Sequence, residues 1–403
     1  MRAVLWILAI LILVAGALGA VGYVLSNRVI VPTPYGLMPE FNVVGVKQTP
    51  SAAPWPPSVL PQPLVDATAE ADSLVVALPL PAGSAQFENT LVEGAYGLMW
   101  QGGHGLLGEV LNRAGGQVER ELRVLGGAPP TSGSPARMDN FLYRTDPGAL
   151  GLEFEELTLQ GPVGDLRAWF VPADGGTAVL MLHGRRRGEL AELLRPLGAF
   201  NQLGLPALAL AYRNHDASSA SPDGLFHYGA SEWEDALVGA RELRARGYDR
   251  VLLYGVSMGG AVALEALERW PADAPEVVGV VLDSPLIDPF PVIELGAEKA
   301  GMPLPGLLTR LGLFVAGLRT GVDFGSLRQY QDAGGIPVPL LLIAGEGDTT
   351  VPISAIDRFA QAVAAPLTYV RLPGVEHVEA WNQDPAAYLE WLRLFIASLN
   401  VSA

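Results

Sequence analysis

Cysteine is absent from the 403-residue sequence, and basic residues are scarce beside acidic ones. The first absence excludes disulfides, thiolate nucleophiles, cysteine zinc sites and a cysteine-linked lipid anchor. Lys and Arg total 26 against 42 Asp and Glu, a formal net charge of −16. That balance argues against nucleic acid as a partner, because a phosphate backbone is bound by concentrated positive charge. Half of the residues are hydrophobic and only 17% are charged, so a mainly disordered chain is also excluded.

Residues 3–25 form an almost wholly apolar run, with Arg2 before it and Arg28 after it. About 20 apolar residues suffice for a helix to cross a bilayer, so we expect residues 1–28 to be a single-pass transmembrane anchor. The alternative is a cleaved signal peptide, for which Ala15-Gly16-Ala17 offers a small-x-small site. The flanking charges favour an extracytoplasmic catalytic half, which would be secreted if the segment were cleaved.

Two segments separate this run from the second half of the chain. Residues 31–81 contain eleven prolines, which predicts a Pro-rich linker over residues 29–83, with a coil packed on a domain as the alternative. Short apolar runs broken by glycine predict a small β-rich module over residues 84–150. Its Gly103-x-Gly105-x-x-Gly108 fits the dinucleotide pattern, but Gly115-Gly116 stops any following helix after two turns. We therefore interpret the pattern as a glycine-rich turn.

The second half alternates strand and helix patterns. Residues 154–160 and 166–171 predict a hairpin. The following strands are continuous apolar runs, as in strands covered on both faces; they span 177–182, 207–211, 250–254, 277–282, 339–344 and 367–372. Helical patterns span 189–203, 230–246, 258–270, 353–365 and 385–399. This order predicts an α/β domain over residues 151–403 with a doubly wound, mainly parallel sheet. In such sheets the site lies at the carboxyl ends of the strands.

A candidate nucleophile ends one of these strands. The run 250–254 leads into Gly255-Val256-Ser257-Met258-Gly259, a G-x-S-x-G pattern followed at once by a helical pattern. Such a strand-to-helix turn is a nucleophile elbow, which lifts the serine hydroxyl above the sheet. Glycine is needed on both sides because the tight turn leaves no room for side chains. The helix start also offers free backbone N–H groups to a developing oxyanion.

A candidate acid and a candidate base follow later strands. After 339–344 comes Gly345-Glu346-Gly347-Asp348, and Asp348 is the candidate acid, with Glu346 as the near alternative. His377 follows the strand 367–372. The chain order Ser257, Asp348, His377 is the order expected of a triad with an elbow serine. A serine hydroxyl attacks only when an imidazole takes its proton, and a carboxylate fixes the tautomer of that imidazole.

With these residues, the chain resembles the α/β-hydrolase superfamily, most closely its bacterial esterase-like and prolyl-oligopeptidase-related branch. The resemblance covers about residues 150–400. It is carried by the hairpin at 152–171, Leu182-His183-Gly184, Tyr212-Arg213-Asn214-His215, Tyr228-Gly229 with Glu232-Trp233 and Asp235, residues 255–260, Leu282-Asp283-Ser284-Pro285, residues 345–352 and Glu376-His377.

This resemblance implies a serine hydrolase without metal or organic cofactor. It places the oxyanion hole at the backbone N–H groups of Met258 and Arg185. His183 is expected to order the loop after its strand, and it is also a substrate-pocket candidate with Arg186. Where similar proteins usually have small or amide residues, this loop reads Arg185-Arg186-Arg187. These charges could steer an anionic substrate or simply be solvated.

Residues 285–337 are longer than a simple connection between strands needs. Their leucines, with Leu308 and Phe314 among them, follow helical spacing. They predict either a crossover helix packed on the sheet or a cap over Ser257 that lines an acyl pocket; Leu308 and Phe314 are pocket candidates. No pair of the five histidines has i, i+4 spacing and no carboxylate cluster accompanies them, so no metal site is expected. Asp283 is expected to form structural hydrogen bonds.

The function that this sequence predicts is hydrolysis of a small-molecule ester or other acyl substrate through an acyl-enzyme. A serine peptidase or amidase and an acyltransferase remain alternatives on the same triad. A catalytically inactive, membrane-tethered binding scaffold is the alternative of another class. The sequence does not indicate an oligomeric state.

Overall fold

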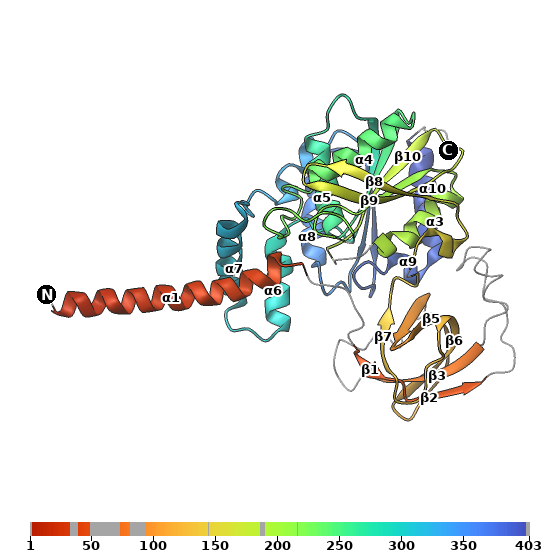
Figure 1. Cartoon of the computed structure of the whole chain (residues 1–403), viewed down its shortest axis with the longest axis horizontal. Helices are drawn as coiled ribbons and strands as arrows, with labels where there is room; N and C mark the ends of the chain where they lie inside the picture. Colours follow the sequence, from red (N-terminus) through yellow and green to blue (C-terminus); the bar gives the residue numbers. More distant parts are fainter. Residues whose placement is uncertain are drawn as a thin grey trace.

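The computed structural model describes residues 2–32, 39–48, 73–80, 94–143, 145–185, 190–215 and 217–399. They form an N-terminal helix, an antiparallel β module and an α/β domain (Figure 1). The α/β domain has an eight-stranded sheet in the order β15-β14-β13-β12-β10-β11-β9-β8. Its strands are β8 (Glu155–Gly161), β9 (Gly164–Val171), β10 (Thr177–Leu182), β11 (Ala207–Leu210), β12 (Arg250–Val256), β13 (Glu276–Asp283), β14 (Leu340–Gly345) and β15 (Leu367–Leu372).

The sheet confirms the predicted doubly wound, mainly parallel architecture. β10 to β15 pair in parallel, while the hairpin β8–β9 joins β11 antiparallel. The helices of this domain, including 3₁₀ turns (η), are η2 (Pro147–Leu150), η3 (Leu190–Leu193), α3 (Leu194–Gln202), α4 (Trp233–Ala245), α5 (Met258–Glu268), α6 (Pro289–Lys299), α7 (Pro305–Thr320), η4 (Gln329–Gln331), η5 (Ala333–Gly335), α8 (Ile353–Ala362), α9 (Ala380–Gln383) and α10 (Pro385–Ser398).

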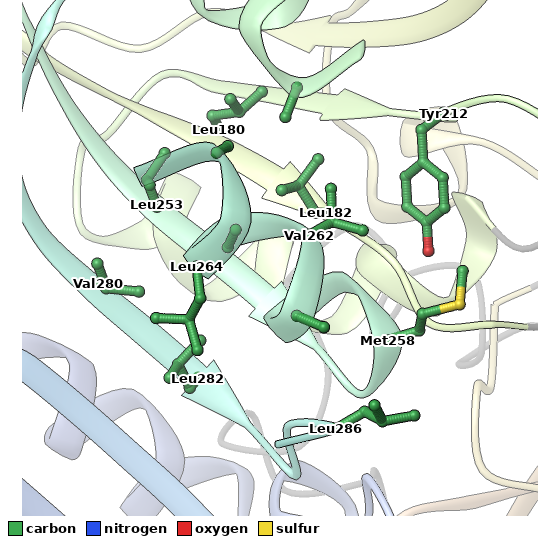
Figure 2. Close-up of a cluster of buried hydrophobic side chains, with 14 of the residues drawn as sticks. Leu180, Leu182, Tyr212, Leu253, Met258, Val262, Leu264, Val280, Leu282 and Leu286 are labelled. Carbon is green, nitrogen blue, oxygen red and sulfur yellow. The ribbon is translucent and has the colours of Figure 1, made fainter. Parts of the chain in front are cut away.

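Each central strand buries side chains on both faces of the sheet. Leu180 and Leu182 of β10 belong to one core with residues of α4, α5 and α8, and Figure 2 shows this core around α5. Val179 and Met181 of the same strand belong to the opposite core with residues of α3 and α10. Because both faces are dry, no position on these strands needs a polar side chain. This explains the continuous apolar runs in the sequence.

The β module is a seven-stranded antiparallel sheet in the order β1-β7-β4-β5-β6-β3-β2. Its ends, β1 and β2, are consecutive in the chain. Val43 N–H donates to Ser134 O at 2.9 Å and Val44 N–H to Ala77 O at 2.8 Å, so the sheet curls until its ends nearly meet. Its strands are β1 (Phe41–Asn42), β2 (Gly45–Gln48), β3 (Ser73–Pro79), β4 (Tyr96–Trp100), β5 (Gly103–Ala114), β6 (Gln117–Gly127) and β7 (Pro135–Asp139).

The module reaches further back than the predicted boundary at residue 84. β1, β2 and β3 come from residues 29–83, the stretch predicted as a linker; β1 pairs with β7, β3 pairs with β6, and β2 pairs with β3. Two of these strands are only two and four residues long, too short to stand out among the prolines. The glycine pattern at 103–108 opens strand β5, which pairs with β6 in a hairpin. It is therefore neither a phosphate loop nor a turn.

The N-terminal helix α1 (Arg2–Ile30) extends away from the body, and its final turns pack beside α7 (Figure 1). Glycines bring the two backbones together: a Cβ on Gly22 would lie 2.6 Å from Val315 Cγ2, and one on Gly312 would lie 3.0 Å from Leu25 Cβ. Ile30, at the end of α1, is buried in the α/β core. The final turn of α1 is therefore part of the α/β domain.

The predicted transmembrane segment, residues 3–25, lies within α1. Among the residues that the structure describes, no helix is long and apolar enough to cross a membrane.

Candidate active site

Ser257 stands between β12 and α5 in a backbone conformation that only a tight turn imposes. Its φ is +51° and its ψ −119°, and its N–H donates to Asp283 O at 3.0 Å. The flanking glycines are required sterically. A Cβ on Gly255 would lie 2.5 Å from Gly259 O, and a Cβ on Gly259 would collide with Leu182 O. The G-x-S-x-G pattern thus lets the elbow sit directly against the end of β10.

His377 connects Ser257 to Asp348. Its Nε2 lies 2.9 Å from Ser257 Oγ, and its Nδ1 lies 2.7 Å from Asp348 Oδ2. A carboxylate oxygen only accepts hydrogen bonds, so Nδ1 carries the proton and Nε2 is free to accept one from the serine. The three residues come from the ends of β12, β14 and β15, which meet at the carboxyl edge of the sheet.

Asp348 is fixed by its own backbone neighbours. Its Oδ1 accepts hydrogen bonds from the N–H groups of Thr350 and Val351, both at 2.7 Å, and its side chain is fully buried. Glu346, the alternative acid, instead pairs with the half-exposed Arg371 at 3.3 Å. The structure therefore brings Asp348, and not Glu346, to the histidine.

The loop after β10 lies beside the serine. A Cβ on Gly184 would stand 3.3 Å from Ser257 Cβ, and the Gly184 N–H donates to Glu192 Oε2 at 2.5 Å. The Gly184 carbonyl accepts a hydrogen bond from Tyr212 Oη at 3.1 Å. Because a trans peptide sets its C=O and N–H in opposite directions, the Arg185 N–H points away from Tyr212. Met258 is the first residue of α5, where N–H groups lack an intrahelical acceptor.

A cavity of about 890 Å³ opens over Ser257 and His377. Helices α6 and α7, from the segment 285–337, form part of its wall, and Ile293, Leu308 and Gly312 are among the lining residues. This position favours the predicted cap over a crossover helix that packs only on the sheet. Phe141, after the last strand of the β module, also lines it.

The N-terminal helix contributes to the same cavity, which the sequence did not predict. Leu25, Arg28 and Val29 line it. The end of α1 is held by hydrogen bonds to its carbonyls: Tyr228 Oη donates to Val29 O and Arg185 Nη2 to Arg28 O, both at 2.6 Å. The Arg185 guanidinium thus binds the end of α1 and also lines the cavity. Substrate steering and solvation stay predictions for the three arginines, of which Arg187 lies outside the described residues.

Two predicted pocket residues lie away from the cavity. His183 is completely buried, its ring stacks on Tyr212 at 4.4 Å, and its Nδ1 lies 2.8 Å from Gly184 O. Burial holds the pKa of His183 well below its usual value, so the ring is neutral and orders the loop. Phe314 lies on the outer face of α7 and is 64% exposed, because Leu308 occupies the inner face. Arg186 lies outside the described residues.

Asp283 is buried at the end of β13. Tyr388 Oη donates to its Oδ2 at 3.0 Å and Ser284 Oγ to its Oδ1 at 3.2 Å. Burial raises the pKa of the Asp283 carboxyl. These bonds agree with the predicted structural role.

Two carboxylates in the cavity wall were missed by the sequence analysis. Glu192 accepts the Gly184 N–H, and Glu379 accepts a hydrogen bond from Tyr96 Oη at 2.8 Å. Burial, reinforced by the nearby Glu376, raises the pKa of Glu379 to about 7. Neither residue belongs to a sequence motif, so only tertiary structure identifies them. Within the described ranges, no group of His, Asp or Glu side chains could hold a metal ion.

A doubly wound sheet with a serine in a tight strand-to-helix turn and a histidine after the last strand is the arrangement of one known class of fold. Known protein families and structures match this chain in the same region. A family model described as "Alpha/beta hydrolase family" matches residues 179–391. The chain belongs to the alpha/beta hydrolase family. A second model, "Domain of unknown function (DUF8805)", matches residues 85–139 of the β module.

Individual proteins are also similar to this chain over much of its length. An uncharacterized protein of Mycobacterium tuberculosis is 30% identical over 247 residues, which cover 59% of this chain and 76% of that protein. The uncharacterized protein YfhR of Escherichia coli is 24% identical over 269 residues, 64% of this chain and 85% of YfhR. An esterase of Pyrococcus furiosus superposes with a TM-score of 0.51 at 23% identity, covering 64% of this chain and 95% of the esterase. At that identity, the likeness shows the fold alone.

Proposed function

We propose that this protein is a serine hydrolase that cleaves carboxylic esters through an acyl-enzyme on Ser257. The observation that supports the proposal best is the hydrogen-bonded series Ser257, His377 and Asp348 at a cavity that apolar residues of α6 and α7 line in part. It has the nucleophile, base and orienting acid that acyl transfer needs, with His377 Nε2 2.9 Å from Ser257 Oγ and His377 Nδ1 2.7 Å from Asp348 Oδ2.

In the proposed reaction, Ser257 Oγ attacks the ester carbonyl carbon while His377 Nε2 takes its proton. The backbone N–H groups of Met258 and Arg185 hold the oxyanion. The protonated His377 then gives its proton to the leaving alkoxide, and the acyl group stays on Ser257. Water, deprotonated by His377, attacks the acyl-enzyme, and the proton returns to Ser257 as the acid departs. Asp348 holds the imidazole in the required tautomer throughout.

The test is hydrolysis of p-nitrophenyl esters of increasing chain length by the full-length protein and by Ser257→Ala. Ser398→Ala, on an exposed position of α10 remote in sequence from the three residues, is the matched control. We expect turnover by the wild type and the control, and none above background for Ser257→Ala. Equal turnover by Ser257→Ala would refute the assignment of the nucleophile.

The alternatives on the same residues differ in product. A peptidase or amidase would cleave acyl p-nitroanilides at rates comparable to those for esters. An acyltransferase would give a new ester rather than free acid when a competing alcohol is supplied. An inactive scaffold would bind a partner but would turn over none of these substrates.

We propose further that α1 associates with a lipid membrane, with the α/β domain on the extracytoplasmic side. Support comes from apolar side chains that are exposed on neighbouring helices. On α1 these include Leu13 and Leu18, and on α7 Leu307, Phe314 and Leu318, each between 51% and 73% exposed. Fractionation of expressing cells tests this. The protein is expected in washed membranes, and recovery in the soluble fraction would exclude the association.

A further inference from the structure

The β module meets the α/β domain at the loop that carries His377. The contact is made by α9, which begins three residues after the histidine. Ala95 N–H donates to Asn382 O at 2.8 Å, and Asn382 Nδ2 donates in return to Ala95 O at 2.5 Å. The same amide also donates to Asn140 O at 2.9 Å. Asn382 is completely buried, so its bonds to Ala95 form away from water.

A second contact lies between the first and the histidine. Tyr96 of β4 donates its hydroxyl to Glu379 Oε2 at 2.8 Å, and both side chains are buried. Glu379 is two residues after His377. A hydrogen bond to a carboxylate is among the stronger polar interactions in a protein interior. The module thus holds the histidine loop at two points three residues apart.

The edge of the β module that faces α9 has a backbone that allows this close contact. Gly94 has a φ of +135°, and a Cβ there would collide with the carbonyl of Asn382. The Gly94 carbonyl accepts a hydrogen bond from Arg120 at 3.4 Å. Arg120 itself is completely buried within the module and also donates to Gly108 O at 2.7 and 2.9 Å. A buried guanidinium and a glycine in a conformation that other residues avoid therefore shape this edge.

The loop being held is strained at the residue after the histidine. Val378 has a φ of +61°, which is a true outlier for a β-branched residue. Its N–H donates to Ser284 Oγ at 3.1 Å, and its carbonyl accepts a hydrogen bond from Arg195 Nη1 at 3.2 Å. Arg195 Nη1 also donates to Asn382 Oδ1. A continuous set of hydrogen bonds therefore runs from the module through Asn382 and Arg195 to the strained residue.

We propose that the β module positions His377 for catalysis, through Tyr96 on Glu379 and through Ala95 and Asn140 on Asn382. This inference rests on the proposed function, and it gives a role to the region that matches a domain of unknown function. Tyr96 and Asn382 are positioning residues, because they act through the backbone of the histidine loop. Without their bonds Val378 can relax, and the imidazole then loses its alignment with Ser257 and Asp348. A misplacement of about 1 Å can cost about a hundredfold in rate.

Two substitutions in the full-length protein test this inference. Tyr96→Phe keeps the ring and removes the donor to Glu379. Asn382→Asp keeps the oxygen that Arg195 binds and removes the amide donors to Ala95 and Asn140. The matched control is Tyr143→Phe, which removes a buried hydroxyl that has no hydrogen-bond partner among the described residues.

The measurements are kcat and KM on a p-nitrophenyl ester, the rate of fluorophosphonate labelling of Ser257, and the melting temperature. Activity is expressed per folded active site, counted by complete labelling. We expect kcat and the labelling rate to fall together, about tenfold for Tyr96→Phe and more for Asn382→Asp, with KM within about twofold of the wild type. Tyr143→Phe should match the wild type. If Asn382→Asp does not fold, Tyr96→Phe decides the test alone.

Unchanged kcat in Tyr96→Phe and in any folded Asn382→Asp would overturn the positioning role while leaving the proposed function intact. A rise in KM at constant kcat would also overturn it, since the module would then shape the pocket rather than the histidine. Failure of the proposed function gives a different result. In that case the wild-type protein itself shows neither turnover nor labelling.

Discussion

Ser257 and Val378 both have positive φ values, although neither is a glycine. Such conformations persist only where the surrounding structure imposes them, and they cluster at functional sites. One precedes α5 and presents a hydroxyl; the other follows His377 and directs the chain towards α9. The strain therefore lies on either side of the 2.9 Å contact between Ser257 Oγ and His377 Nε2.

Asp348→Asn tests the orienting acid at the scale of a single residue. If the amide oxygen replaces Oδ1 beneath the backbone N–H groups, the amide nitrogen faces His377 Nδ1, and two donors then oppose each other. We expect kcat to fall roughly 10³- to 10⁴-fold with KM little changed. The control is Glu346→Gln, on the nearby carboxylate that pairs with Arg371. It should retain activity within about twofold, and the reverse pattern would make Glu346 the acid.

At the scale of elements, the cap is a set of three helices. α6 and α7 come from the segment before β14, and the final turns of α1 complete the cavity wall. Leu308 faces the cavity, whereas Leu318 on the same helix is 71% exposed. One helix therefore offers matched positions on its inner and outer faces.

Leu308→Trp is expected to restrict the acyl pocket. The larger ring fills cavity volume that a long acyl chain would occupy, so KM for a decanoate ester should rise about tenfold while that for acetate changes less than twofold. Leu318→Trp, on the outer face, should leave both unchanged. Equal effects of Leu308→Trp on the two esters would show that the chain does not bind along α7.

Strands β10 to β15 and the order of Ser257, Asp348 and His377 could be predicted because they depend on local pattern. Strands that are buried on both faces have continuous apolar sequences, and the turn around Ser257 needs glycines at fixed positions. The contacts of α1 and β4 with the α/β domain could not be predicted in this way. Leu25 lines the cavity over Ser257, and Tyr96 bonds to Glu379 across 283 positions of sequence. No period or motif in the chain encodes such contacts, which arise only when domains pack.

At the scale of the whole molecule, the β module and the α/β domain share buried polar contacts as well as apolar surface. Glu379 is a buried titratable group at that interface. Burial and Glu376 raise its pKa to about 7 from 4.5, against the hydrogen bond from Tyr96 and the charges of Arg195 and His377. Between these two pH values the folded protein holds a proton there that the unfolded chain has released.

The free energy of unfolding should therefore fall as pH rises from about 4.5 to about 7, by about 1 to 3 kcal/mol from this group. Glu379→Gln, which cannot ionise, should flatten this part of the stability curve. Urea unfolding of the two proteins at pH 5 and pH 7 measures the difference. Glu298→Gln, on an exposed position of α6, is the control and should keep the wild-type slope. An identical slope in Glu379→Gln would show that another group dominates.

The most direct test of the account is the site of covalent modification by a fluorophosphonate, located by mass spectrometry of the labelled full-length protein. The account predicts one adduct, on Ser257, that is absent from Ser257→Ala and forms at least a hundredfold more slowly in His377→Ala. A folded wild-type protein that stays unlabelled, or an adduct that maps to another residue, would contradict it.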